Sequence, residues 1–177
     1  PSIFDQIRLP EDSSLRNAMR IQNPLGEDAS IMRTVALPSM LAILARNNAY
    51  HNDAVKLYEL AKVYLPKPGQ ILPDEPKHLV LGTYGEHETF FTMKGEIDAL
   101  LQLLNVKPAE YVANRENPSY HPGRCADILI DGKLAGTIGQ IHPLVAETYG
   151  IGGEVYVADL DFTTIEASLA EERVFHS

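Results

Sequence analysis

The groups best suited to chemistry in this chain are six histidines, one cysteine and scattered carboxylates. His87-Glu88 begins like the zinc-binding helix motif H-E-x-x-H, but Phe91 stands where the second histidine belongs. A thiolate zinc site needs several cysteines, and Cys125 is the only one in the sequence. As a nucleophile Cys125 would need a histidine partner, whereas a small, half-buried strand residue is the commoner role. These residues therefore predict no metal site.

The remaining chemical patterns are also weak. Asp159 and Asp161 are two residues apart, so on a strand they point the same way, as a carboxylate pair would; solvation of a strand end is the commoner reason. A small hydrolase using His121 or His142 with a carboxylate is an open alternative. The glycines of 150–153 precede an expected strand rather than a helix, which favours a helix-ending turn over a phosphate loop.

Arg33 is an isolated cation in an apolar stretch that follows a polar turn at 23–28. A charge beside so much apolar surface needs an acceptor, because an unpaired buried charge is too costly to keep. An arginine that extends out of the core into solvent is the ordinary interpretation. An acceptor across an interface with a partner chain is the functional one.

A helix is expected directly after this arginine, over residues 39–50, with Pro38 and Ser39 at its start. Met40, Leu41 and Leu44 share one face of that helix, which suits packing against another helix. The next element, a strand over 55–65, alternates apolar and polar residues. Glu59 falls on its apolar face, so its carboxylate must be paired or lie at a solvent-facing end.

Other elements follow from periodicity and turn residues. Asp131-Gly132 suits a tight hairpin turn, and the stripe Met93, Ile97, Leu100, Leu101, Leu104 suits a core helix starting at Thr92. We expect strands at 3–9, 18–22, 78–84, 126–130, 134–141 and 154–161, helices from 92, at 144–149 and at 162–169, and a surface loop at 66–77. The sum predicts an α+β domain: an antiparallel sheet flanked by helices.

Bulk properties limit the function. The 177 residues suit one domain with a sizeable core, and 45% hydrophobic content excludes a disordered chain. Fifteen cations against 24 anions give a charge of −9, the wrong sign for gripping phosphates over a broad surface. The longest apolar run, 35–45, is too short for a bilayer, and no secretory signal is visible. The lone cysteine fits a reducing cytoplasm, and the start at Pro1 suggests an excised piece or a processed product.

Several short motifs carry a resemblance when they are taken in order. They are Asn23-Pro24-Leu25, Met32-Arg33-Thr34, Leu37-Pro38 with Leu41, Leu57-Tyr58-Glu59-Leu60, Val63-Tyr64, His121-Pro122-Gly123-Arg124, Asp127-Ile128, Gly139-Gln140-Ile141-His142-Pro143, Tyr156-Val157 and Asp159-Leu160-Asp161. No single motif is specific, but the ordered set over about residues 20–162 resembles the beta subunit of phenylalanyl-tRNA synthetase.

The resemblance implies a single core domain over 1–177 that looks like a class II synthetase catalytic domain but has lost catalysis. In that family two alpha and two beta chains assemble in the cytoplasm, and the alpha chain charges tRNA with phenylalanine. ATP and magnesium then belong to the whole enzyme, with no cofactor in this piece, and tRNA is held mainly elsewhere. No membrane is involved. The interface with the alpha subunit is expected at Arg33, Thr34, Met40, Leu41, Leu44 and Arg124, although a surface arginine on a hairpin rim explains Arg124 equally well.

Arginine positions support the loss of catalysis that the resemblance implies. Class II enzymes neutralise the ATP phosphates with arginines, whose planar forks match phosphate oxygens. This chain has no arginine between Arg46 and Arg115, nor between Arg124 and Arg173. Lysines at 62, 67 and 94 offer only point charges. We therefore expect no catalytic residues here and an inactive module. A class II-like paralogue acting as an amino-acid-binding or regulatory homodimer is the alternative.

Overall fold

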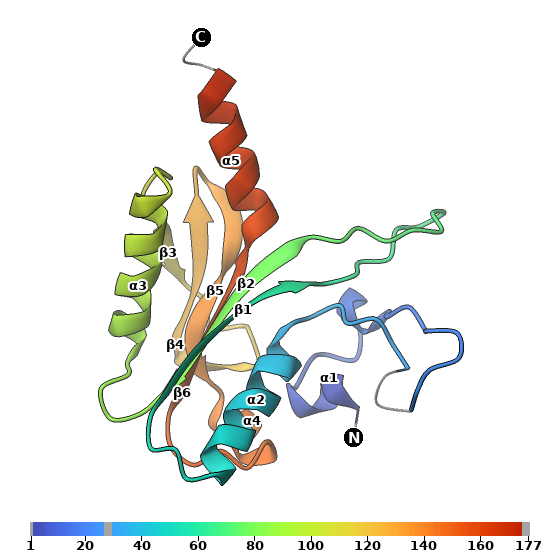
Figure 1. Ribbon diagram of the computed structural model, residues 1–177, viewed down its shortest axis with the longest axis vertical. Coiled ribbons are helices and arrows are strands. Elements are labelled where there is room, and N and C mark those ends of the chain that lie inside the picture. Colours follow the sequence, from blue (N-terminus) through green and yellow to red (C-terminus); the bar gives the residue numbers. More distant parts are fainter. Residues whose placement is uncertain (1, 27–29, 175–177) are drawn as a thin grey trace.

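A six-stranded antiparallel sheet forms the centre of the computed structural model, which describes residues 2–26 and 30–174. Its strand order is β1-β2-β6-β5-β4-β3 (Figure 1). The strands are β1 (Val55–Lys62), β2 (Lys77–Tyr84), β3 (Glu110–Ala113), β4 (Tyr120–Ile130), β5 (Lys133–Ile141) and β6 (Val155–Asp161). The helices are α1 (Ile3–Gln6), α2 (Leu37–Ala49), α3 (Phe90–Leu103), α4 (Pro143–Thr148) and α5 (Phe162–Val174), with a short 3-10 turn at Ser14–Arg16. The predicted α+β class is confirmed.

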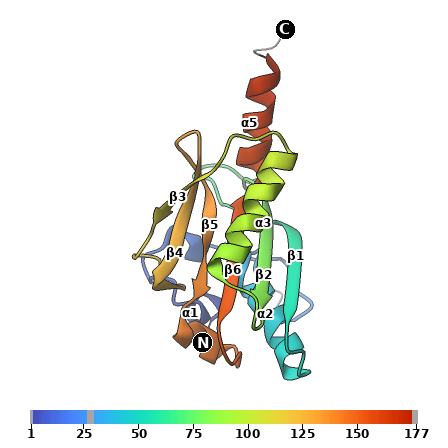
Figure 2. The same ribbon diagram turned by 90° about the vertical axis from the view of Figure 1, so that its left-hand side faces the viewer.

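Helices cover both faces of the sheet. On one face α2 and α4 pack over the inward side chains of several strands, and Ile7, just after α1, joins them. On the other face α3 and α5 pack over the alternate residues of the same strands (Figure 2). Successive strand residues point to opposite faces, so two separate apolar clusters form on one sheet. The inner strands of the sheet are consequently covered on both sides, whereas the edge strands β1 and β3 stay partly exposed.

Two turn predictions are confirmed by backbone angles. Asp131 and Gly132 both have positive φ, 51° and 73°, as a two-residue hairpin turn between β4 and β5 requires. Gly150 has φ 72° directly after α4, the left-handed conformation that commonly ends a helix. One or two residues were therefore enough to predict each of these turns. The helix after β6 continues to Val174, beyond its expected end at 169. Residues 175–177 lie outside the described part, as do 27–29, which include the last two residues of the expected turn at 23–28.

Several sequence expectations were wrong. Residues 3–9 do not form a strand, because Ser2 and Asp5 make a capping box that starts the short helix α1. At 18–22 only one isolated bridge forms, between Arg20 and Ile31. Strand β3 was missed altogether. Strand β4 begins at Tyr120 rather than at 126, since Pro122 and its neighbours interrupt the alternation where the pairing register shifts.

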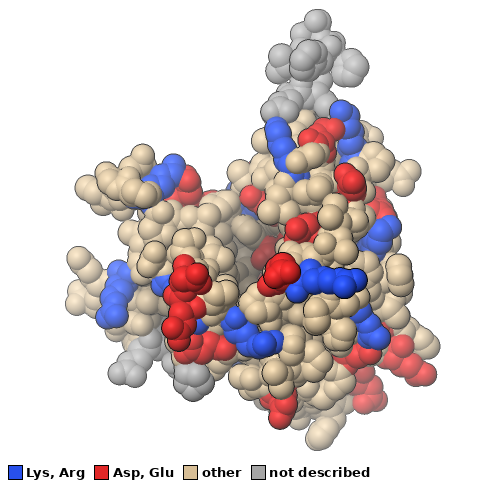
Figure 3. All heavy atoms as spheres, turned by 180° about the vertical axis from the view of Figure 1, so that it is seen from behind, with Lys and Arg blue, Asp and Glu red and all other residues tan. Residues whose placement is uncertain are grey.

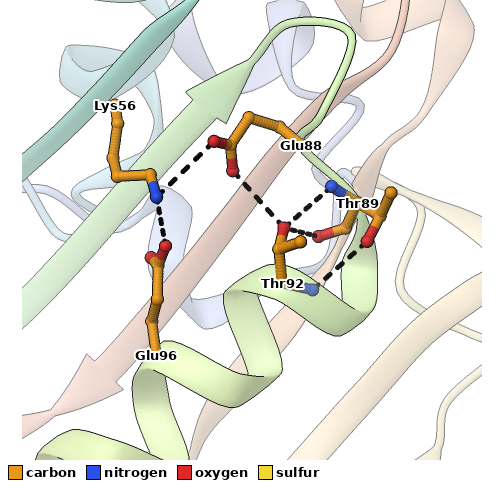
Figure 4. A network of polar contacts seen from close by, with 5 residues as sticks. All are labelled: Lys56, Glu88, Thr89, Thr92 and Glu96. Atoms are coloured by element: carbon orange, nitrogen blue, oxygen red, sulfur yellow. Dashed lines mark hydrogen bonds and ion pairs between the residues drawn. The ribbon is translucent and has the colours of Figure 1, made fainter.

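Helix α3 starts earlier than expected, and a polar network fixes its first turn (Figure 4). Thr89 is the N-cap: its hydroxyl accepts from the Thr92 amide, and the Thr92 hydroxyl accepts from the Thr89 amide at 2.9 Å. Lys56 of β1 bridges Glu88, 3.5 Å away, and Glu96 one turn into the helix. Thr92 is therefore the third helical residue of a capping box, not the cap.

Candidate partner interface

Arg33 finds its acceptors inside the chain. Its Nε donates to the Lys62 carbonyl at 2.8 Å, and Nη1 lies 3.4 Å from Glu59 Oε1. The Arg33 carbonyl in turn accepts from the Tyr64 amide at 2.8 Å, so the segment runs beside the end of β1. Both side chains are about one-third exposed, at 31%. The requirement that Glu59 be paired is confirmed, and Arg33 needs no partner chain to supply an acceptor.

Thr34 and Arg33 act in this structure as attachments for the N-terminal segment and β1. Thr34 is buried, and its hydroxyl donates to the Leu15 carbonyl. Glu59 keeps one buried oxygen, Oε2, without a hydrogen-bond partner. A buried oxygen without a donor is costly, so a further donor at this atom would stabilise the edge of β1. Contact of Arg33 or Thr34 with a partner chain stays a prediction.

Three residues expected at the partner interface lie in the core instead: Met40, Leu41 and Leu44. Their exposed fractions are 1%, 0% and 0%, and they pack on this chain's own sheet rather than on another helix. A Cβ added at Gly82 of β2 would lie 2.6 Å from Met40 Sδ and 2.9 Å from Leu44 Cδ1, so the helix rests directly on that glycine. These three side chains are core residues in the described structure, because the apolar face of α2 meets the sheet of its own chain.

The outward face of α2 carries exposed side chains that the sequence analysis did not single out. Ile43 is 40% exposed and Tyr50, just past the helix end, is 75% exposed; Arg46 lies between them at the surface. Spacings of three and four residues place the three in one line along the helix. Sequence periodicity points to the larger apolar face, Met40, Leu41 and Leu44, so it selected the core side instead of this outer line.

Arg124 joins a polar row across three strands. Its Nη1 donates to Gln140 Oε1 at 2.7 Å and to Glu154 Oε1 at 2.8 Å. The other oxygen of Glu154 accepts from the Tyr156 hydroxyl at 2.7 Å. Both hydrogen bonds lower the pKa of Glu154, and the bond from Tyr156 has a larger effect than the bond from Arg124. Arg124 is about half exposed, so a partner contact there stays a prediction.

The candidate nucleophile, Cys125, and the candidate bases, His121 and His142, have structural roles. Burial, with the charge of Asp127, raises the pKa of Cys125 to about 12, so the thiol is not activated. His121 Nδ1 accepts from the Gly123 amide at 3.0 Å. His142 Nδ1 accepts from the Leu144 amide at 3.1 Å and caps α4. The described residues contain no group of three or more His, Cys, Asp or Glu side chains placed to hold a metal ion.

A histidine–carboxylate pair that sequence reasoning missed joins β2 to β6. His78 Nδ1 lies 2.6 Å from Asp159 Oδ1, and both side chains are mostly buried. Asp161, opposite His78 in the pairing register, instead accepts from the Thr164 amide at the start of α5. The two aspartates share a face as expected, but each has its own partner. The pair was invisible in the sequence because 81 residues separate its members.

The pH dependence of stability should report this pair. Burial alone would lower the pKa of His78, but the hydrogen bond with Asp159 and the charges of Asp159 and Asp161 outweigh it and raise that pKa. A raised folded-state pKa stabilises the protein fully below the unfolded value, about 6.5, and this contribution is lost as pH rises through the folded value. We therefore expect urea midpoints to fall from pH 6 to pH 8, and less so in His78→Gln. An equal fall in His78→Gln would contradict the assignment, whereas His51→Gln, at an exposed site, is the control.

Charges on the surface are mixed. On the face opposite that of Figure 1, basic and acidic side chains alternate without a broad basic area (Figure 3). The net charge of −9 agrees with this distribution. Among residues 2–26 and 30–174, no helix is long and apolar enough to cross a membrane. The mixed charge disfavours nucleic-acid binding on the visible face.

The fold and its polar contacts describe an α+β module in which Arg33, His78, Arg124, Cys125 and His142 have structural contacts. The family model described as the phenylalanyl tRNA synthetase beta chain CLM domain matches residues 1–162. The chain therefore belongs to the phenylalanyl-tRNA synthetase beta chain family, as its motifs indicated.

Curated relatives agree with the family match. Phenylalanine–tRNA ligase beta subunits from Clostridium acetobutylicum, Clostridium tetani and Geobacter metallireducens are 41%, 40% and 38% identical to it. These matches cover 99%, 93% and 92% of this chain but only 22%, 21% and 22% of the relatives. The chain thus spans about a fifth of the length of the relatives it matches. Their shared name does not favour the alternative of an independent paralogue.

Proposed function

We propose that these 177 residues form a single, non-catalytic core domain of a phenylalanine–tRNA ligase beta subunit. The match of residues 1–162 to the beta chain CLM domain carries this proposal. The domain would resemble a class II synthetase core and support the charging of tRNA with phenylalanine by the alpha subunit. It would act in the cytoplasm, within an assembly of two alpha and two beta chains.

The lack of arginines that could bind ATP phosphates supports a scaffold role rather than catalysis. Between Arg46 and Arg115 the sequence has no arginine, so β1, β2 and α3 contribute no guanidinium fork for ATP phosphates. Arg124 is engaged by Glu154 and Gln140. ATP and magnesium would accordingly act in the alpha subunit, and tRNA would be held mainly by other domains of the beta chain.

The outer face of α2 is the best-placed surface for the alpha subunit. The inner face of this helix already packs on the sheet, while Ile43 and Tyr50 remain exposed. Aromatic and large apolar residues at the centre of a contact contribute most of the binding energy. Arg33 lies near the start of the same helix, since its Nη1 donates to Ser39 Oγ at 3.3 Å. Arg33 would thus fix the start of α2, next to the partner contact predicted for Arg33 and Thr34.

Light scattering of this chain mixed with the alpha subunit of the same organism tests the proposal. We expect a stable mixed species, weakened at least about tenfold by Ile43→Asp because a charge would enter a desolvated contact. Leu103→Asp is the matched control, because Leu103 is 80% exposed on α3, on the opposite face of the sheet. Loss of the mixed species in the control but not in Ile43→Asp would place the contact on α3 instead. No mixed species from two folded chains would contradict pairing through this domain.

A further inference from the structure

A cavity of about 600 Å³ lies on the α3 face of the sheet, away from α2. Its walls come from the first turn of α3, from β3, from β4 and from the start of β6. The volume falls within the range of small-molecule sites. Neither the family match nor the proposed pairing through α2 assigns it a role.

The lining of the cavity includes one donor and one acceptor side by side, Arg124 and Glu154, whose side chains are about half exposed. Arg124 Nη1 and Glu154 Oε1 are 2.8 Å apart, and each has a supporting contact beneath it. Gln140, which is 93% buried, accepts from Arg124, and the buried Tyr156 donates to Glu154. Since these contacts hold both charged groups in place, a ligand would meet an ordered pair rather than two mobile side chains.

The walls are aromatic and also held in place. Phe90 and Phe91 stand edge to face, with ring centroids 5.5 Å apart, on the first turn of α3. The network of Figure 4 fixes that turn through Thr89 and Thr92. On the β3 side the Tyr111 hydroxyl donates to Asp98 at 2.7 Å. Phe91 is nonetheless 77% exposed, so part of the wall lacks a covering group.

We propose that this cavity binds a small, neutral, planar ring whose edge presents an N–H donor next to a carbonyl acceptor, the chemistry of a nucleobase lactam. The N–H would donate to Glu154, the carbonyl would accept from Arg124, and the ring would contact the phenylalanines. The charges of the pair compensate each other, so the site favours a neutral ligand. Phosphates are disfavoured by the net charge of −9 and by Glu88 at the α3 start.

Inosine is the test ligand, because its six-membered ring carries N–H and carbonyl groups side by side. We expect titration into the ¹⁵N-labelled chain to shift the amide signals of Gly123 and Ala126. 1-Methylinosine lacks the donor and should bind about tenfold more weakly, because its methyl group would meet Glu154 without donating a hydrogen bond to it. Equal binding of the two nucleosides, or no shift at the cavity, would overturn the proposal.

Variants separate a specific site from weak surface contact. Phe91→Ala removes exposed wall area without touching the core and should weaken inosine binding several-fold. Leu103→Ala, an exposed apolar residue in the last turn of the same helix, is the matched control and should leave binding unchanged. Glu154→Ala should abolish the preference for inosine over 1-methylinosine; a preference that survives would overturn the proposed edge contact.

Two further ligands test whether the cavity binds a free nucleoside, a nucleic acid strand or an amino acid. An unpaired tetranucleotide of inosine should bind more weakly than the nucleoside; tighter binding would overturn the preference for a neutral free ring. Free tyrosine, a zwitterion with an aromatic ring, should not compete with inosine. Competition by tyrosine would replace the lactam proposal by an amino-acid site.

Discussion

Replacing Gly136 by alanine is expected to lower the free energy of unfolding by about 3 kcal/mol or more. A Cβ at this position would lie 2.2 Å from the Asp159 carbonyl oxygen and 3.0 Å from the Leu160 Cα. Both are backbone atoms of β6, so no flexible side chain can yield. Gly136 is also paired on both sides, with Ile128 of β4 and Leu160 of β6. Relief would therefore require displacing strands at the centre of the sheet.

Gly95→Ala is the control for this prediction. Gly95 lies in the interior of α3, and an added Cβ there meets no heavy atom within 4 Å. Alanine should raise stability by up to about 1 kcal/mol, because glycine loses more backbone freedom in a helix. Urea unfolding of both variants measures the difference in midpoint at similar slope. If Gly136→Ala matched the wild type, β5 and β6 could not lie as close as described.

Local patterns predicted most of the fold. The strand expected at 55–65, observed as Val55–Lys62, follows from alternation, and the helix expected at 39–50, observed as Leu37–Ala49, follows from Pro38 at a helix start. Both patterns are properties of neighbouring residues. Strand β3 was missed because four residues give too short a pattern. The wrong strand at 3–9 shows the other limit: a capping box of Ser2 and Asp5 outweighed the apolar residues that follow it.

The polar contacts were harder to predict than the elements. That Glu59 must be paired or lie at a solvent-facing end followed from its place on an apolar strand face, yet its partner, Arg33, is 26 residues away in sequence. The contact of His78 with Asp159 had no signal in the sequence, because only the β2–β6 pairing brings the two residues together. The sequence therefore indicates which groups need partners, while the sheet order decides which partners they meet.

Leu41→Ala is expected to lower the free energy of unfolding by about 2–5 kcal/mol. Leu41 is fully buried, at 0% exposure, within the cluster that joins α2 and α4 to the sheet. Removing its branched end leaves a cavity, because a helix resting on Gly82 has little freedom to move inward: Met40 and Leu44 already meet that glycine. Calorimetry or urea unfolding of the isolated chain measures the loss without any partner present.

The same helix supplies a control that also decides where the partner surface lies. Ile43→Ala changes a residue that is 40% exposed two positions further on, so stability should stay within about 0.5 kcal/mol of the wild type. With the alpha subunit present, the order should reverse: Ile43→Ala weakens association, whereas folded Leu41→Ala retains it. A stable Leu41→Ala variant that no longer binds would instead place this leucine at the partner surface, as its sequence periodicity first suggested. The two faces of α2 are thus distinguished by two measurements on two neighbouring residues.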